Sequence, residues 1–268
     1  MDQSQGKSEI EAYSPGNRNG CAISVQNITF AYRLQGGVRF DVLKETTFTI
    51  PYGQILGLVG RNASGKSTLL SILRGFLVPQ SGDVHIGSAV VSTKGRLVNL
   101  PKVSLITQRS DAGLAPTMTV FENYVLTLGN GVTGLTWAYS RHMKDQCRSL
   151  LCKAEMGLED KINEQVRFLS GGQQQALSVL LAIEYPEAVL LLDEPTAALD
   201  AFAGKRVLDM ALSEMKLKKG AVILVSHRVR DIAERCERIL VLQGGMVTSD
   251  LDNADFHLKE GDLMHMIE

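Results

Sequence analysis

The chain has 268 residues, of which 28 are Lys or Arg and 29 are Asp or Glu, so its formal net charge is −1 at pH 7. This length is typical of one globular domain, or of one domain with a small subdomain. The near-neutral balance excludes the broad basic surface that binding a nucleic-acid backbone requires. We therefore expect no nucleic-acid partner.

The hydrophobic stretches indicate a chain that does not cross a membrane itself. Residues 176–192 form the longest strongly apolar stretch, but Glu184, Pro186 and Glu187 interrupt it, so it falls short of the ~20 residues that span a bilayer. The first twenty residues hold no apolar core of signal-peptide length, and we expect a cytoplasmic location. The four cysteines form no CxxC pair and are interpreted as reduced packing residues.

The first half of the chain changes pattern twice. Residues 1–20 are polar and aperiodic, which predicts a disordered tail. From Cys21 apolar and polar residues alternate up to Phe48, which predicts a half-buried antiparallel sheet. A continuous apolar strand at 54–59, a glycine-rich turn and a helix around 69–73 follow. Short strands are expected at 84–86 and 103–107, with a connection between them.

The second half alternates helices with apolar strands. Helices are expected at 140–156, ending at Gly157, and at 173–185 and 201–216. Buried strands are expected at 188–192 and 221–225, and a hairpin at 238–249 precedes a short terminal helix. This alternation predicts an α/β fold with a parallel sheet.

A phosphate-binding loop is predicted between the strand at 54–59 and the next helix. Residues 60–67 read GRNASGKS and fit G-x-x-x-x-G-K-[ST] in the strand-to-helix context that this motif requires. Its backbone N–H groups and the helix dipole would hold the phosphates, Lys66 would reach the β- and γ-phosphates, and Ser67 would ligate Mg²⁺. The predicted nucleotide contacts are Gly60, Arg61, Asn62, Ala63, Ser64, Gly65, Lys66, Ser67 and Thr68.

Two carboxylates follow the apolar strand at 188–192. Asp193 would hold Mg²⁺, and Glu194 would act as the general base toward the attacking water. The carboxyl ends of parallel strands are where α/β proteins bind ligands. The alternative is a strand-end carboxylate that caps the next helix.

A second anion-binding loop is predicted at the sequence LSGGQ, residues 169–173. Ser170, Gly171, Gly172 and Gln173 would expose N–H groups at a helix N-terminus. One nucleotide in one chain does not need two such loops, and two chains facing head to tail would use both. Taken alone, this tetrapeptide is more often a helix cap than an anion-binding loop.

The order of these motifs resembles the ATP-binding cassette (ABC) ATPases, over about residues 23–251. The resemblance rests on GRNASGKST at 60–68, Gln108 after VSLIT, LSGGQQQ at 169–175, LLLDEPTAALD at 190–200 and His227 after VILVS. It implies a P-loop core with a mixed parallel sheet, an N-terminal antiparallel β subdomain and an inserted helical subdomain at about 109–175. The cassette would cover 21–251, and a short helix within 252–268 would pack on it.

The resemblance also implies further residue roles. Tyr32 would stack on the adenine, Gln108 would contact Mg²⁺ and the attacking water, Asp200 would lie in a loop crossing the dimer interface, and His227 would contact the γ-phosphate. Ala176 stands where Arg often follows the signature, a departure that puts little in doubt.

Such ATPases bind ATP and Mg²⁺, dimerise, and attach to permease subunits at the cytoplasmic face of the cell membrane, with a substrate-binding protein in importers. The run at 108–140 is similar to importer ATPases for tryptophan or tyrosine. Met118, Val120 and Phe121 would receive a permease helix or pack inside the subdomain. An exporter ATPase, a soluble cassette ATPase and a regulatory module without turnover remain as alternatives.

Overall fold

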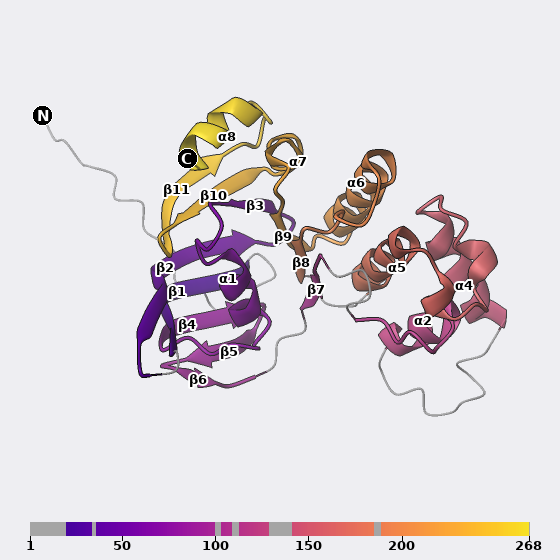
Figure 1. Cartoon of the computed structure of the whole chain (residues 1–268), viewed down its shortest axis with the longest axis horizontal. Helices are drawn as coiled ribbons and strands as arrows, with labels where there is room; N and C mark the ends of the chain where they lie inside the picture. Colours follow the sequence, from indigo (N-terminus) through magenta and orange to yellow (C-terminus); the bar gives the residue numbers. More distant parts are fainter. Residues whose placement is uncertain are drawn as a thin grey trace, which may run out of the picture.

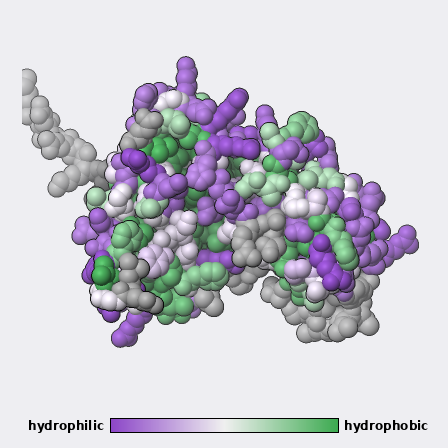
Figure 2. Space-filling view, in the orientation of Figure 1, coloured by the Kyte–Doolittle hydropathy of each residue, from purple (hydrophilic) through white to green (hydrophobic). Residues whose placement is uncertain are grey.

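The computed structural model of the chain describes residues 20–33, 36–99, 103–108, 113–128, 141–184 and 189–267. A strand-rich part and a smaller group of helices lie on either side of the strands β7 and β8 (Figure 1). Hydrophobic residues surface in separate patches among hydrophilic ones on the face shown in Figure 2. The predicted tail at 1–20 lies almost wholly outside the described residues.

The antiparallel sheet has the strand order β2-β1-β4-β5-β6. Its strands are β1 (Cys21–Arg33), β2 (Arg39–Pro51), β4 (Ser81–Ile86), β5 (Ala89–Thr93) and β6 (Arg96–Leu97). The prediction of β1 and β2 is confirmed. Strands β5 and β6 were predicted as a connection, because they are short and their turns depend on the positive φ of Gly87 and Gly95, which the hydrophobic pattern does not reveal.

The second sheet has the order β11-β10-β3-β9-β8-β7, and its pairs are parallel except β10–β11. Its strands are β3 (Ile55–Val59), β7 (Ser104–Ile106), β8 (Val189–Asp193), β9 (Ala221–Val225), β10 (Arg238–Gln243) and β11 (Met246–Asp252). β3 and β9 are buried throughout, as their continuous apolar runs predict. Successive side chains of β3 enter two hydrophobic clusters: Ile55 and Val59 in one, Leu56 and Leu58 in the other.

The helices divide between the two parts of the molecule. α1 (Lys66–Leu73), α6 (Ala201–Leu217), α7 (Val229–Arg235) and α8 (Glu260–Ile267) accompany the sheets. The helical group contains α2 (Val120–Leu128), α4 (Arg141–Cys152), α5 (Gly171–Glu184) and the 3-10 turns η1 (Glu159–Lys161) and η2 (Val166–Phe168). Helix α8 packs on α7 and β10 and buries Leu263.

Two predicted helix boundaries were wrong. α4 ends at Cys152, not at Met156, because the chain then turns, with Glu155 and Gly157 both at positive φ. α5 begins at Gly171, two residues before the predicted start, because Ser170 and Gln173 cap it. These ends depend on local turns and not on the apolar stripe.

Candidate functional site

The phosphate-binding loop is closed by glycines with no room for a side chain. Gly60 has φ 155°, and a Cβ there would lie 2.1 Å from the Leu242 carbonyl oxygen of β10. Gly65, which precedes α1, has φ 108°, and its Cβ would lie 2.8 Å from Leu43 Cδ2. Both residues sit where L side chains are strained. The loop is therefore wedged between β3, β2 and β10.

Lys66 lies across this loop. Its Nζ donates to the carbonyl oxygens of Gly60 at 2.7 Å and Arg61 at 3.0 Å. Burial lowers the pKa of Lys66, and the carboxylates of Asp193 and Glu194 oppose that shift. A cation held over a ring of backbone groups is suited to phosphate oxygens.

The residues predicted to hold Mg²⁺ have donors that fit this ion. Ser67 Oγ donates to Asp193 Oδ2 over 3.4 Å, so a hydroxyl and a carboxylate face each other between α1 and β8. Hard oxygen donors of this kind suit Mg²⁺, which keeps several waters when bound through few protein ligands. Burial raises the pKa of Asp193, while the bond from Ser67 and the charge of Lys66 lower it.

Glu194 is held in an unusual position at the end of β8. Its φ of 54° is left-handed, and its N–H donates to the Val225 carbonyl oxygen of β9 at 3.0 Å. Its Oε1 lies 3.8 Å from His227 Nε2, and among the described residues this buried oxygen accepts no hydrogen bond. Burial raises the pKa of Glu194, and the charge of His227 opposes it. A buried acceptor without a partner fits a bound water.

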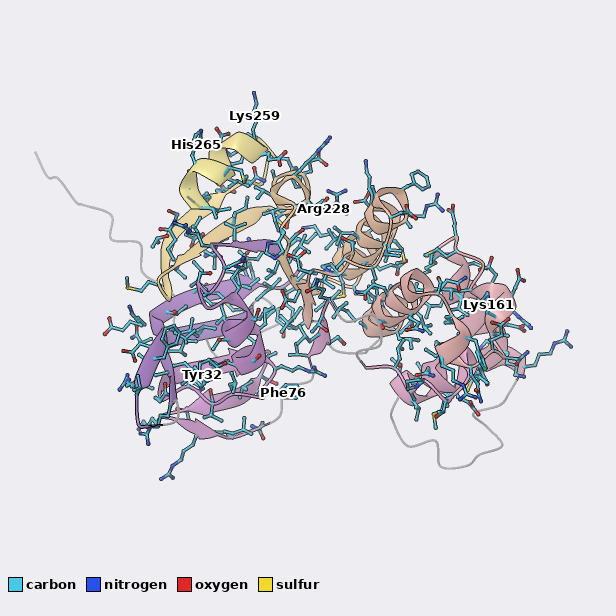
Figure 3. All side chains as sticks on the ribbon, in the orientation of Figure 1. Tyr32, Phe76, Lys161, Arg228, Lys259 and His265 are labelled. Atoms are coloured by element: carbon cyan, nitrogen blue, oxygen red, sulfur yellow. The ribbon has the colours of Figure 1, made fainter. Side chains whose placement is uncertain are left out.

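A cavity of about 300 Å³ brings most of the predicted site residues together. Its lining includes Tyr32, residues 62–68, Asp193, Glu194 and His227. Tyr32 lies in the strand-rich part, on the side of the molecule away from Lys161 in the helical group (Figure 3). Gly60 and Arg61 line an adjoining hollow of about 430 Å³ with His227 and α8. The sequence interpretation missed three lining residues, namely Phe40, Val42 and Val225. Finding them requires knowing how their strands pair, which the sequence pattern does not give.

The second anion-binding loop, residues 169–173, which we call the signature loop, lies outside the residues that line this cavity. Ser170 and Gln173 cap each other, with Gln173 N–H donating to Ser170 Oγ and Ser170 N–H to Gln173 Oε1, both at 3.2 Å. This reciprocal pair of hydrogen bonds is the capping box of a helix N-terminus. A Cβ on Gly171 would meet nothing within 4 Å, so the loop surface is open there. Within this chain the loop therefore acts as a helix cap.

Two other predicted site residues also lie outside the cavity lining. Gln108 is exposed just after β7. Asp200 caps α6, accepting from the N–H groups of Phe202 and Ala203 at 2.9 Å each.

Gln175 links α5 to two segments of the candidate site, and the sequence interpretation missed it. It is fully buried in α5, and its Nε2 donates to the carbonyl oxygens of Pro195 at 2.8 Å and Thr107 at 3.3 Å. These two acceptors adjoin Glu194 and Gln108 in the chain. Gln175 thus ties the helix that follows the signature loop to the segments carrying both residues. The signal that the sequence offered was a glutamine at the start of an otherwise apolar helical run.

A phosphate-binding loop at the carboxyl ends of parallel strands, with Ser67, Asp193 and Glu194 around it, defines the P-loop nucleotide hydrolases. The family profile described as ABC transporter matches residues 43–197, and the chain belongs to this family. It is therefore an ABC-type ATPase and the ATP-binding subunit of a transporter. No helix among the described residues is long and apolar enough to cross a membrane.

Known relatives include transport ATPases of several kinds. The chain is 28% identical over 233 residues to a tyrosine transport ATP-binding protein of Clostridioides difficile, covering 87% of this chain and 93% of that protein. It is 33% identical over 213 residues to the aliphatic sulfonates import ATP-binding protein SsuB of Shigella flexneri serotype 5b, covering 78% and 74%. The resemblance drawn from the sequence is thereby confirmed.

Solved structures confirm the predicted fold class. The dimeric structure of MJ0796, a bacterial ABC transporter cassette, matches with a TM-score of 0.71 at 27% identity, covering 86% of this chain and 98% of that one. A dimeric post-hydrolysis state of the same cassette, bound to ADP and Pi, matches with a TM-score of 0.73 at 26% identity over the same shares.

Proposed function

We propose that two copies of this chain close head to tail around two Mg-ATP and drive a permease that takes up a small solute such as an amino acid. The observation that carries this proposal is the separation of the two loops. The phosphate loop lines the cavity, whereas the signature loop lies outside it with an open surface at Gly171. A second copy would supply its Ser170–Gln173 to this cavity, and Asp200 would lie in the loop between the two.

Each site residue then has a defined task. Lys66 and the N–H groups of the phosphate loop hold the phosphates, and Tyr32 stacks on the adenine ring. Ser67, Asp193 and Gln108 would hold Mg²⁺, which supplies charge neutralisation at the phosphates when bound. Glu194 accepts the proton of the attacking water through its free Oε1. His227, exposed beside Glu194, contacts the γ-phosphate.

A groove of about 650 Å³ supports the permease partner. It lies among β7, α2 and α5, with Leu105, Leu114, Leu126 and Leu181 in its lining. The side chain of Leu126 is 57% exposed, so the groove offers apolar surface to a partner helix. Val120 and Phe121, expected as possible contacts, are buried within the helical group, whereas Met118 stays exposed. The permease would place the chain at the cytoplasmic face of the cell membrane.

Uptake of an amino acid is supported by the relative that carries a tyrosine transport name. The relatives named for sulfonate and sugar import show that related cassettes serve different solutes. Solute choice therefore belongs to the permease and to a substrate-binding protein.

The proposal is tested by isolating tagged Glu194→Gln from detergent-solubilised native membranes in ATP and identifying its partners by mass spectrometry. We expect a multi-span permease with this chain as its only cassette. A substrate-binding protein encoded beside it would establish import. Recovery from the soluble fraction alone, with ribosomes or repair proteins, would overturn the transport role and leave the ATPase chemistry intact.

A further inference from the structure

We propose that Phe40 is a second aromatic wall for the nucleobase and that it sets a preference for purine over pyrimidine nucleotides. The inference rests on the proposed placement of the nucleotide, with its base on Tyr32. Phe40 lies on β2 directly opposite Tyr32 of β1 in the antiparallel register. Directly opposed residues of such a pair project from the same face of the sheet with neighbouring Cβ atoms.

Both aromatic residues line the nucleotide cavity and are also exposed. Phe40 is 52% exposed and Tyr32 is 41% exposed, and both line the cavity that holds the phosphate loop. Phe30 meets the Tyr32 ring edge to face, with 5.0 Å between centroids, and the Tyr32 hydroxyl lies 3.4 Å from Thr68 Oγ1. Tyr32 is thus contacted from two sides, and Phe40 occupies the paired position on the neighbouring strand, in the lining of the same cavity.

The chemistry of this end of the cavity points to stacking. Among the described lining residues, β1 and β2 contribute Tyr32, Phe40 and Val42, which are aromatic or aliphatic. Apart from the Tyr32 hydroxyl, the polar side chains of the lining belong to the phosphate loop and to the ends of β8 and β9. Apolar and aromatic faces bind a base through its π-surface and do not distinguish hydrogen-bonding edges. A two-ring purine covers both Tyr32 and Phe40, and a one-ring pyrimidine covers only one of them. Adenine and guanine nucleotides should therefore bind alike.

The test measures equilibrium binding of ADP, GDP, CDP and tripolyphosphate to Phe40→Ala by isothermal titration calorimetry. These ligands avoid turnover, and tripolyphosphate has no base. We expect Phe40→Ala to weaken ADP and GDP about five- to tenfold, in line with the loss of one base-stacking contact. CDP should change much less and tripolyphosphate not at all. Phe40→Tyr should restore the wild-type preference.

Val38→Ala is the matched control, because Val38 precedes β2 by one residue, is 60% exposed and does not line the cavity. It should bind all four ligands as the wild type does. Unchanged ADP affinity in Phe40→Ala would overturn the inference, and so would an equal loss for tripolyphosphate, which would mean a disturbed phosphate loop. Failure of the wild type to bind any nucleoside diphosphate would instead overturn the placement of the nucleotide.

Discussion

The two anion-binding loops of this chain are built to opposite plans. The phosphate loop is enclosed: a side chain at Gly60 would collide with β10 backbone, and Lys66 bridges two of the loop's own carbonyl groups. The signature loop is open, with free space at Gly171, and Ser170 and Gln173 each accept a hydrogen bond through the side chain from the backbone N–H of the other.

Under the proposed head-to-tail pairing, this difference makes each loop one half of a site. In the proposed site Ser67, Asp193 and Glu194 lie around the enclosed loop, and the partner copy would add a second set of N–H groups. The open loop presents its N–H groups at a helix N-terminus. It does not line the cavity that contains Asp193 and Glu194. Changes in the first should affect binding and chemistry, and changes in the second should affect closure.

Glu194→Gln should give the largest effect, because it removes the proton acceptor from the enclosed site. We expect hydrolysis to fall about 100- to 10,000-fold, the range of a lost general base, with ATP binding retained. Single-turnover ATPase assays beside equilibrium binding measure both. Hydrolysis near the wild-type rate would remove Glu194 from the role of base.

Lys66→Ala should weaken nucleotide binding by about 30-fold or more, since truncating one partner of a close charge pair costs about 2 kcal/mol or more. Lys66→Arg is the control, because it keeps the positive charge but replaces the compact ammonium with a larger, planar guanidinium. Calorimetric titration with ADP measures the loss. Wild-type affinity in Lys66→Ala would show that the loop N–H groups suffice.

Ser170→Asn should separate the two uses of the signature loop. Asparagine caps a helix as well as serine does, so the stability of α5 should not change. Its larger side chain would obstruct a facing phosphate, and we expect steady-state hydrolysis to fall about 100-fold or more, on the scale of one lost oxyanion donor. Monomer ADP affinity should stay the same. Full activity in this variant would leave the loop with the cap alone.

Gln175→Leu should loosen the link between α5, the helix that follows the signature loop, and the segments that carry Glu194 and Gln108. It removes buried hydrogen bonds to the Pro195 and Thr107 carbonyl oxygens, and leaving such groups unpaired costs about 1–3 kcal/mol. Urea unfolding measures the stability. Gln174→Leu is the neighbouring control, because that side chain bonds to Val166 and Leu169 and does not reach either catalytic segment. Equal hydrolysis losses in the two variants would contradict a positioning role for Gln175.

The acid side of the pH–rate profile should give the smallest effect. Burial raises the pKa of Glu194 above its ordinary value of 4.5, and the base works only when deprotonated. Activity should therefore fall with decreasing pH at a midpoint above 4.5. Circular dichroism over the same range checks that the chain stays folded. A midpoint at or below 4.5 would contradict the buried setting of Glu194.

The sequence predicted the parts that have a strong local signal. The apolar runs of β3, β8 and β9 and the glycine pattern of the phosphate loop have only one structural solution in this order. Turns at positive φ determine where strands β5 and β6 lie and where α4 ends. The spacing of hydrophobic residues along the sequence does not predict such turns. Phe40 and Gln175 were missed because their importance comes from register and burial.

The central claim is that each phosphate loop works with the signature loop of another copy. Mixing Lys66→Ala with Ser170→Asn tests it, because a head-to-tail pair of these two variants has one intact site and one doubly altered site. We predict that the mixture regains roughly a quarter of the wild-type ATPase activity, from half of the pairs with half of their sites. Activity no higher than that of the separate variants would contradict the account, because both loops would then have to belong to one chain.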